Sequence, residues 1–158
     1  MTGPHKADGF PEDTLIAWDM ESIDYFDSYV IESETAKPVD HIAREIFALP
    51  SWVVALLKLR HVLIARPFGL RTGTLNRKTH GSDFRPMTVI DKNENEVLMG
   101  DDDKHLNFLF SVMKRNRKEL SEITLTTVVK FHNTWGRVYF AFVKPFHKVI
   151  VKSILKKI

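Results

Sequence analysis

Residues 87–132 constrain the fold more than any other part of the sequence. They contain four apolar segments, at 87–90, 96–100, 105–114 and 123–132, which short polar connections separate. In the two longer segments the side chains alternate between two faces, as they do in half-buried strands. One face carries Leu106, Phe108, Phe110, Val112, Ile123, Leu125, Thr127, Val129 and Phe131, and the other carries His105, Asn107, Leu109, Ser111, Thr124, Thr126, Val128 and Lys130. Because short connections favour hairpins, this stretch predicts an antiparallel sheet.

The residues before this stretch predict one further strand and two helices. Residues 23–33 are rich in aromatic and β-branched side chains, which predicts a first strand at or near the edge of the sheet. Apolar residues then recur at helical spacing from Pro38, and again from Ser51 until about Gly69. The sequence therefore predicts two short consecutive helices, followed by a long polar loop at residues 71–86.

The last segment, residues 134–158, is apolar at helical spacing and predicts a long amphipathic helix. The arc predicted to face the sheet consists of Val138, Tyr139, Phe142, Phe146, Val149, Ile150 and Ile154. The opposite arc carries Lys144, Lys148, Lys152 and Lys156. Pro145 is expected to kink this helix, because proline removes a backbone donor and clashes with the preceding turn. The alternative is a last strand at residues 137–144, with Pro145 opening a shorter helix.

Length and composition place the chain among globular proteins. With 158 residues, 44% of them hydrophobic and 27% charged, we expect one domain at residues 21–158 after a flexible lead-in at residues 1–20. The absence of cysteine excludes disulfides and thiolate chemistry, and it indicates a reducing, cytoplasmic location. We expect neither a secretory signal nor a membrane span, because basic side chains interrupt the longest apolar stretch, residues 52–70.

The charges are distributed unevenly along the chain. Residues 12–34 contain eight acidic residues and no lysine or arginine, whereas the residues after Glu122 contain seven basic residues and no acid. The first strand and the last helix are therefore expected to lie near each other, with a modest, salt-screened attraction. The basic end could also contact an anionic membrane or an acidic partner. Nucleic acid is not expected as a partner, because the aromatic residues do not lie among the lysines.

Five strings of residues resemble the bacterial family known as domain of unknown function 2867, and the likeness runs from about residue 24 to residue 158. The strings are Pro50-Ser-Trp-Val-Val-Ala-Leu-Leu-Lys-Leu-Arg-His, Phe68-Gly-Leu, Gly100-Asp-Asp-Asp-Lys-His-Leu-Asn-Phe, Gly136-Arg-Val-Tyr and Val143-Lys-Pro-Phe-His. That family is similar to the START and polyketide-cyclase-like superfamily, whose members bind apolar molecules between a curved sheet and a C-terminal helix. The resemblance implies an α+β helix-grip fold, and it carries no agreed activity.

Two clusters of polar residues are candidates for a metal or catalytic site. Asp101, Asp102 and Asp103 are consecutive, whereas calcium loops alternate their ligands with spacers, so we interpret this cluster as a turn. His105 is expected on the outer face of the sheet, with a structural hydrogen bond to that turn. The remaining histidines and serines show neither the spacing of a zinc site nor a nucleophile elbow, and the chain has no glycine-rich dinucleotide loop. No metal and no cofactor are expected.

The sequence therefore predicts a binding protein for a small apolar or amphipathic molecule, held between the sheet and the last helix. The predicted ligand-binding residues are Trp52, Arg60, Leu106, Phe108, Phe110, Leu125, Thr127, Val129, Tyr139, Phe142, Phe146 and His147. Two alternatives remain. One is an enzyme of cyclase or dehydratase type, in which Tyr139, His147, Arg60 or Thr127 moves a proton or polarises a carbonyl. The other is a module that binds a membrane surface or a partner protein through the basic last helix. A homodimer through the outer sheet face is a further possibility.

Overall fold

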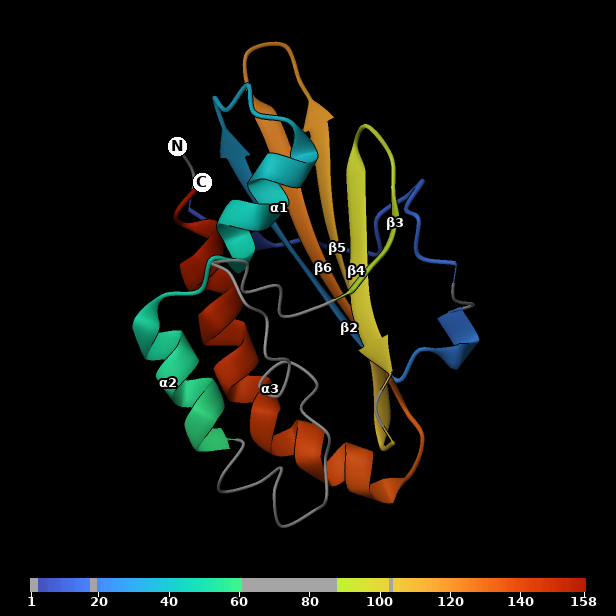
Figure 1. The fold of residues 1–158 in the computed structure, drawn as a ribbon. Helices are drawn as coiled ribbons and strands as arrows, with labels where there is room; N and C mark the ends of the chain where they lie inside the picture. The colour runs from blue at the N-terminus through green and yellow to red at the C-terminus, as the bar shows by residue number, and fades with distance from the viewer. Residues whose placement is uncertain (1–2, 18–19, 61–87, 103) are drawn as a thin grey trace.

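The computed structural model describes residues 3–17, 20–60, 88–102 and 104–158. These residues form a six-stranded antiparallel sheet with helices on one face (Figure 1). The strands are β1 (His5–Lys6), β2 (Tyr25–Ser33), β3 (Thr88–Lys92), β4 (Glu96–Asp102), β5 (Leu106–Asn116) and β6 (Ser121–Phe131). The helices are η1 (Met20–Ser22), α1 (Val39–Phe47), α2 (Ser51–Arg60) and α3 (Thr134–Leu155).

The strand order across the sheet is β1-β2-β6-β5-β4-β3, so four strands that follow one another along the chain form a meander. The predicted antiparallel strands are confirmed, with boundaries that differ by a few residues. The first predicted strand, β2, is second from the edge, because the short β1 pairs with its outer side. The alternation is also confirmed, since Val112 of β5 lies opposite Val97 and Leu125 on the face that carries the helices. This face is called the inner face below.

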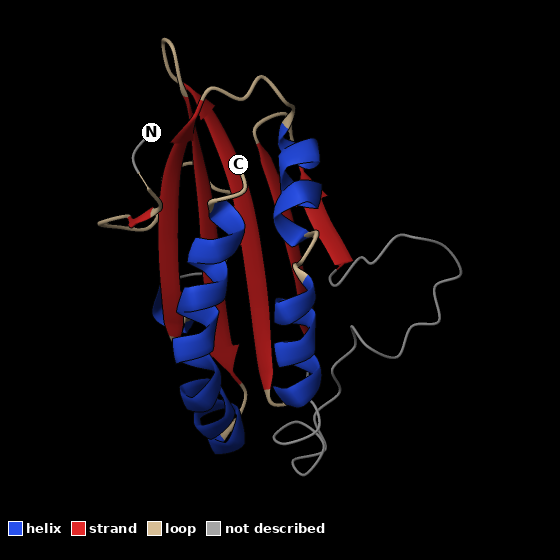
Figure 2. Cartoon of the chain, turned by 90° about the vertical axis from the view of Figure 1, so that its left-hand side faces the viewer, coloured by secondary structure: helices blue, strands red, loops and turns tan. Residues whose placement is uncertain are grey.

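Helices α1 and α2 begin where the sequence predicts them. Helix α1 is amphipathic and buries Val39, Ile42, Ala43, Ile46 and Phe47 against the sheet. It packs on β4 and β5, whereas α3 packs on β6 and β2. Figure 2 accordingly shows two helical columns side by side, with α3 in one and α1 followed by α2 in the other. The predicted end of the second helix and the predicted loop at 71–86 lie outside the described residues.

Helix α3 is continuous through Pro145, so the alternative of a last strand at residues 137–144 is wrong. Figure 1 shows the helix changing direction along its length, as expected of an internal proline. The predicted sheet-facing arc is correct for Tyr139 and Ile154, which are buried, and for Ile150, which is partly buried and packs against the inner-face core. It is wrong for the other members. Four members are exposed: Val138, Phe142, Phe146 and Val149. The buried positions are Gly136, Tyr139, Phe140, Val151, Ile154 and Leu155.

The error has a simple physical cause. Helix α3 is apolar at so many positions that two different rows satisfy helical spacing, and the sheet can cover only one of them. Gly136 helps to determine which row is buried, because a side chain at this position would overlap the carbonyl oxygen of His105. The first turn of α3 therefore approaches the start of β5 closely only with this glycine facing it.

The outer face of the sheet is covered by the N-terminal segment. Ile16 is buried against Leu98, Leu109 and Val128, with Phe10 packed beside them. Figure 1 shows this part of the chain on the side of the sheet opposite to the helices. Residues expected to be a flexible lead-in thus pair with β2 through β1 and fill an apolar cluster on the outer face. The division into a lead-in at 1–20 and a domain at 21–158 stays a prediction.

A buried carboxylate fastens this N-terminal segment to the sheet. Glu96, which is 1% exposed, accepts hydrogen bonds from the Thr14 hydroxyl at 2.6 Å and from the backbone N–H of Leu15 at 2.7 Å. The Ser111 hydroxyl donates to the same carboxylate. The apolar centre of the outer face is therefore covered by the chain itself. The predicted homodimer through this face stays a prediction.

The acidic and basic parts of the chain meet, as predicted. The guanidinium of Arg137, in α3, lies 3.2 Å from the carboxylate of Asp24, which precedes β2. This ion pair joins the basic segment to the acidic one. Among the helices that the structure describes, none combines the length and the apolar character needed to cross a bilayer.

Candidate functional site

Polar side chains gather on the inner face at the middle of the sheet. Asp27 of β2 lies directly opposite Thr127 of β6 in the antiparallel register. Tyr25 precedes Asp27 by two residues and therefore points to the same face. His147, two residues after the proline in α3, contacts this group from the helix side. These four residues are called the central polar cluster below.

Both carboxylate oxygens of Asp27 are hydrogen-bonded. The Tyr25 hydroxyl donates to Oδ2 at 2.6 Å, and Nε2 of His147 lies 3.2 Å from Oδ1. Asp27 is 1% exposed, and the His147 side chain is 10% exposed, so the pair is shielded from water. A carboxylate held in this way fixes the orientation of the imidazole ring.

The surroundings of Asp27 keep its carboxylate charged. Burial by itself would raise the pKa of Asp27, but the hydrogen bond and charge of His147, together with the Tyr25 hydroxyl, outweigh burial and lower it. Tyr25 responds in the opposite direction. Burial and the neighbouring Asp27 charge raise the pKa of the Tyr25 hydroxyl above its ordinary range, so this phenol remains a hydrogen-bond donor.

Thr127 has a buried hydroxyl for which no residue that the structure describes provides a hydrogen bond of good geometry. A side-chain hydrogen bond from Thr127 is the last of the influences that lower the pKa of Asp27, so the hydroxyl lies near this carboxylate, but the contact falls short of a well-formed bond. Thr127 is 2% exposed. Buried hydroxyls are nearly always hydrogen-bonded, because removing one from water without a replacement partner is unfavourable. Among the described residues, the Thr127 hydroxyl therefore has hydrogen-bonding capacity that the central polar cluster does not use.

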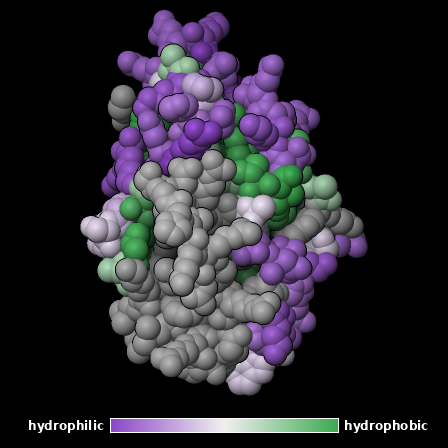
Figure 3. All heavy atoms as spheres, in the orientation of Figure 1, coloured by the Kyte–Doolittle hydropathy of each residue, from purple (hydrophilic) through white to green (hydrophobic). Residues whose placement is uncertain are grey.

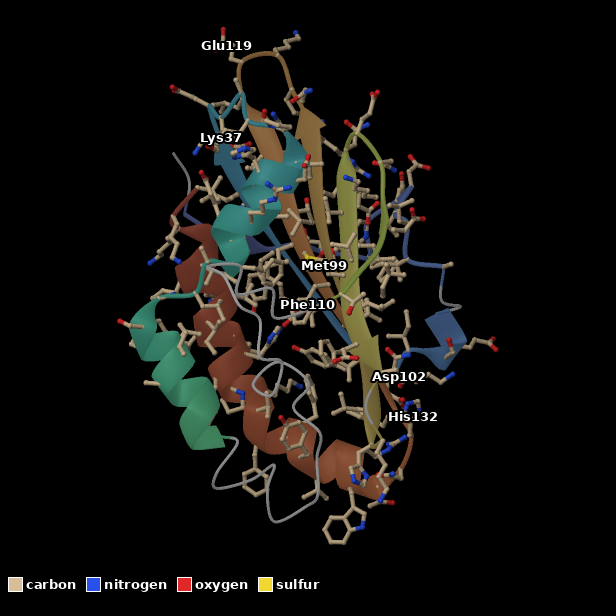
Figure 4. The ribbon with its side chains drawn as sticks, viewed as in Figure 1. Lys37, Met99, Asp102, Phe110, Glu119 and His132 are labelled. Atoms are coloured by element: carbon tan, nitrogen blue, oxygen red, sulfur yellow. The ribbon has the colours of Figure 1, made fainter. Side chains whose placement is uncertain are left out.

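Apolar and aromatic residues surround the central polar cluster. The Phe110 ring lies 6.1 Å from the His147 ring and 5.8 Å from the rings of both Phe108 and Phe47. Phe108 and Phe110 are only half-buried. Figure 4 shows Phe110 beside Met99 near the middle of the sheet, far from the ends marked by Glu119 and His132. The cluster thus separates two apolar regions, one packed under α1 and the end of α3 and the other under the start of α3.

This arrangement can support two kinds of chemistry. A polar group of a bound molecule can hydrogen-bond to Thr127 while the rest of that molecule contacts the aromatic rings. The Asp27–His147 pair can also act on a proton. In the neutral imidazole, if Nε2 carries the hydrogen that bonds Asp27, then Nδ1 is an acceptor, and no residue that the structure describes is hydrogen-bonded to it.

The structure brings together only some of the predicted ligand-binding residues. Thr127 and His147 belong to the central polar cluster, and Phe110 contacts His147. The sheet-facing apolar residues Leu106, Phe108, Leu125, Val129 and Tyr139 pack within the two inner-face cores. Trp52, Phe142 and Phe146 are exposed, so they are not part of this packing. The side chain of Arg60 lies outside the described residues.

Sequence reasoning missed Tyr25 and Asp27, although a signal was present. Period-two alternation in β2 places Tyr25, Asp27, Tyr29 and Ile31 on one face, and that face is otherwise apolar. A single acid in the middle of an inward-facing row is unusual. The signal is obscured because Asp27 also belongs to the run of eight acidic residues at 12–34.

The prediction for His105 is wrong in its partner. His105 is 7% exposed, and its Nδ1 lies 3.1 Å from the side-chain oxygen of Asn133, the residue that caps the start of α3. The expected structural hydrogen bond therefore joins β5 to a helix and not to the aspartate turn. Asp101 and Asp102 are the last two residues of β4, and Asp102 contacts His132 at 2.7 Å. Within the described ranges, no group of three acidic, histidine or cysteine residues is placed to hold a metal ion.

A surface depression of about 380 Å³ lies at another part of the molecule, between the β2–α1 connection and the β5–β6 turn. Charged residues of both signs line it, including Glu34, Lys114, Arg117 and Glu119. Figure 3 shows that this end of the molecule is mainly hydrophilic. It lacks the apolar lining that an apolar ligand requires, so the central polar cluster is the better candidate site.

Comparison with known protein families identifies the family of the chain. The family model described as "Protein of unknown function (DUF2867)" matches residues 20–154. The chain belongs to the DUF2867 family. The match includes all four residues of the central polar cluster and nearly all of α3, so the site lies within the DUF2867 domain. No curated protein and no solved structure matches the chain.

Proposed function

We propose that this DUF2867 domain binds a small, mainly apolar molecule with one polar group, which hydrogen-bonds at the central polar cluster. The buried hydroxyl of Thr127 carries this proposal, because it has no hydrogen bond of good geometry to any residue that the structure describes and can therefore bond to a polar group of a ligand. Apolar sites of this kind typically use a few polar groups to orient a ligand and a larger apolar surface to hold it.

The aromatic side chains next to the cluster support an apolar body for this ligand. Phe108 and Phe110 are half-buried and stand edge to face, which leaves ring surface available beside His147. The order of elements, with two short helices after β2 and a long C-terminal helix over the sheet, is similar to that of a START-like helix-grip domain. We assign the domain to that architecture as part of the proposal.

Substitution of Thr127 by valine tests the proposal, because it replaces the hydroxyl by a methyl group of similar size. We expect Thr127→Val to lower affinity for the ligand while leaving the fold intact. Ligand retention is measured by native mass spectrometry of protein purified from its own host. Binding of 1-anilinonaphthalene-8-sulfonate, an amphipathic aromatic probe, gives an independent measurement.

Thr124→Val is the matched control. Thr124 is a buried threonine of the same strand, but it lies on the outer face, so this substitution leaves the central polar cluster unchanged. If both variants retained the host molecule and the probe equally well, Thr127 would have no role in binding and the proposal would fail. An increase of about 1 kcal/mol in the stability of Thr127→Val, without any change in binding, would identify a merely unsatisfied core hydroxyl.

The Asp27–His147 pair favours a second candidate, an enzyme of cyclase or dehydratase type that acts on a polyketide-like substrate. A charged carboxylate that orients an imidazole is a common arrangement for a general base. Binding alone does not require such a pair, so the two functions can be separated. Asp27→Asn should leave binding of a substrate measurable while it lowers turnover at least about a hundredfold. Unchanged turnover in this variant would exclude the Asp27–His147 pair as the general base, and no turnover by the native chain would exclude the enzyme hypothesis.

A further inference from the structure

Helix α3 carries a row of large apolar side chains that does not face the sheet. The exposed fractions are 56% for Trp135, 38% for Val138, 58% for Phe142, 50% for Phe146 and 61% for Val149. These residues recur at steps of three or four and therefore follow one side of the helix. They are called the exposed apolar row below.

The exposed apolar row is separate from the residues that hold α3 on the sheet. Tyr139, Phe140, Val151, Ile154 and Leu155 already bury the other side of the helix. The exposed row therefore adds little to the packing of the described chain. A continuous strip of large apolar side chains on a surface usually marks a contact with another molecule or with a membrane.

A second row, of lysines, borders the exposed apolar row. Lys144 lies 4.9 Å from the Tyr25 ring centre and Lys152 lies 5.8 Å from the Tyr29 ring centre, so this row runs along the side of α3 next to β2. Successive residues of a helix are rotated by about 100°, so the exposed apolar row lies on the other side of the solvent-facing surface of α3, away from β2. Lys148 and Lys156 are exposed, and no acidic residue occurs after Glu122. The outward surface of α3 is thus apolar along one border and basic along the other.

We propose that α3 docks this domain onto a bilayer that contains anionic lipids. The helix would lie parallel to the membrane plane, with Phe142, Phe146 and Val149 in the interfacial region. The lysines would extend their stems along the helix and place their ammonium groups at lipid phosphates. This is surface binding and not insertion across the bilayer, which agrees with the character of the described helices.

The charge pattern selects a membrane over a second copy of the chain. A symmetric dimer through the exposed apolar row would bring two lysine rows together, and like charges at an interface repel. An anionic surface is attracted to the same lysines while it accepts the apolar side chains. The proposal does not depend on the ligand proposed above, because none of its residues belongs to the central polar cluster.

Vesicle co-sedimentation tests the proposal. Phosphatidylcholine vesicles with and without phosphatidylglycerol are the probes, and we expect binding only when phosphatidylglycerol is present. The double substitution Phe142→Ser and Phe146→Ser should lower the partition coefficient at least about tenfold. Lys148→Glu and Lys156→Glu should each lower it about fivefold, and added salt should weaken binding of the native chain.

Two control variants carry matched changes elsewhere on the surface. Val89→Ser with Ile90→Ser removes exposed apolar side chains from β3, and Lys118→Glu reverses an exposed charge at the β5–β6 turn. Both should bind vesicles as the native chain does. Because Phe142 and Phe146 are exposed, their substitution should leave the thermal unfolding midpoint nearly unchanged, which separates lost docking from lost folding.

Three outcomes would overturn the proposal. The first is no binding to either vesicle, and the second is binding that ignores phosphatidylglycerol content. The third is a dimer of the native chain, seen by analytical ultracentrifugation, that Phe142→Ser with Phe146→Ser converts to a monomer. That result would assign the exposed apolar row to a second copy of the chain.

Discussion

Glu96 and Asp27 are both buried carboxylates of the same sheet, but they lie on opposite faces and have different partners. Glu96 accepts three hydrogen bonds, one of them from the backbone N–H of Leu15 and two from the hydroxyls of Thr14 and Ser111. Asp27 is held by two titratable side chains, Tyr25 and His147, and lies beside the Thr127 hydroxyl, which has no well-formed hydrogen bond to any described residue. The first arrangement is complete and fixes one segment to another. The second leaves hydrogen-bonding capacity unused, which is what a binding or catalytic site requires.

Glu96→Ala is expected to change the stability of the chain more than any substitution at Asp27 or its partners. The substitution leaves buried donors unpaired and releases residues 14–16 from the outer face. We expect the free energy of unfolding to fall by about 3 kcal/mol, measured by urea denaturation. Binding of 1-anilinonaphthalene-8-sulfonate at the inner face should stay unchanged at temperatures where the variant is folded. A loss below about 1 kcal/mol would show that the N-terminal segment is held by its apolar contacts alone.

Asp27→Asn should have a smaller effect on stability but a larger one on function. An amide can keep one hydrogen bond, yet it loses the charge that favours the contacts with Tyr25 and His147, so we expect a loss of about 2 kcal/mol. Stability is measured by urea denaturation, and ligand retention by native mass spectrometry. A variant that lost stability but left both ligand retention and the turnover of any substrate unchanged would assign Asp27 the same purely structural role as Glu96.

Tyr25→Phe is expected to cost less still, about 1 kcal/mol, because it removes one hydrogen bond to a carboxylate that keeps its other partner. The ring remains and continues to pack against Phe140, whose centre lies 4.7 Å away. Comparison of the melting curves of Tyr25→Phe and the native chain measures the effect. Equal or higher stability in the variant would mean that this hydrogen bond contributes nothing net.

The smallest predicted effect is a change of stability with pH. The pKa of Asp27 in the folded chain lies below its ordinary value of 3.8, so its contribution is fully present above that pH and is lost as the pH falls through the folded pKa. The difference in unfolding free energy between the native chain and Asp27→Asn should therefore shrink only below about pH 4. Chemical denaturation in a pH series measures it. A difference that stays constant down to about pH 2 would contradict the lowered pKa.

Much of the fold could be predicted from the sequence, because local periodicity determines strands and helices. The alternation in β5 and β6 gave the correct inner and outer faces, and the first helices began at the predicted residues. Periodicity alone did not determine which of two apolar rows on α3 would be buried. That choice depends on close packing at Gly136 and on contacts with distant strands, which no local pattern contains.

The candidate site was harder to predict than the fold. Thr127 and His147 were predicted as ligand-binding residues, but Asp27, which lies opposite Thr127 and contacts His147, was not. The pairing of Asp27 with Thr127 depends on the register between β2 and β6, which are separated by most of the chain. The covering of the outer face by Ile16 was missed for a similar reason, since the short N-terminal segment shows no periodicity of its own.

The pairing of β2 with β6 also determines when the site can form. The hairpins from β3 to β6 connect neighbours in sequence and can form early, but β2 must wait for a strand that is made much later. His147 and Asp27 are 120 residues apart, so a growing chain cannot assemble the central polar cluster until most of α3 has been synthesised. Long-range contacts of this kind slow folding. During synthesis the apolar inner faces of β2 and α1 would be exposed to solvent for that interval, and exposed apolar surface of this kind is prone to aggregation.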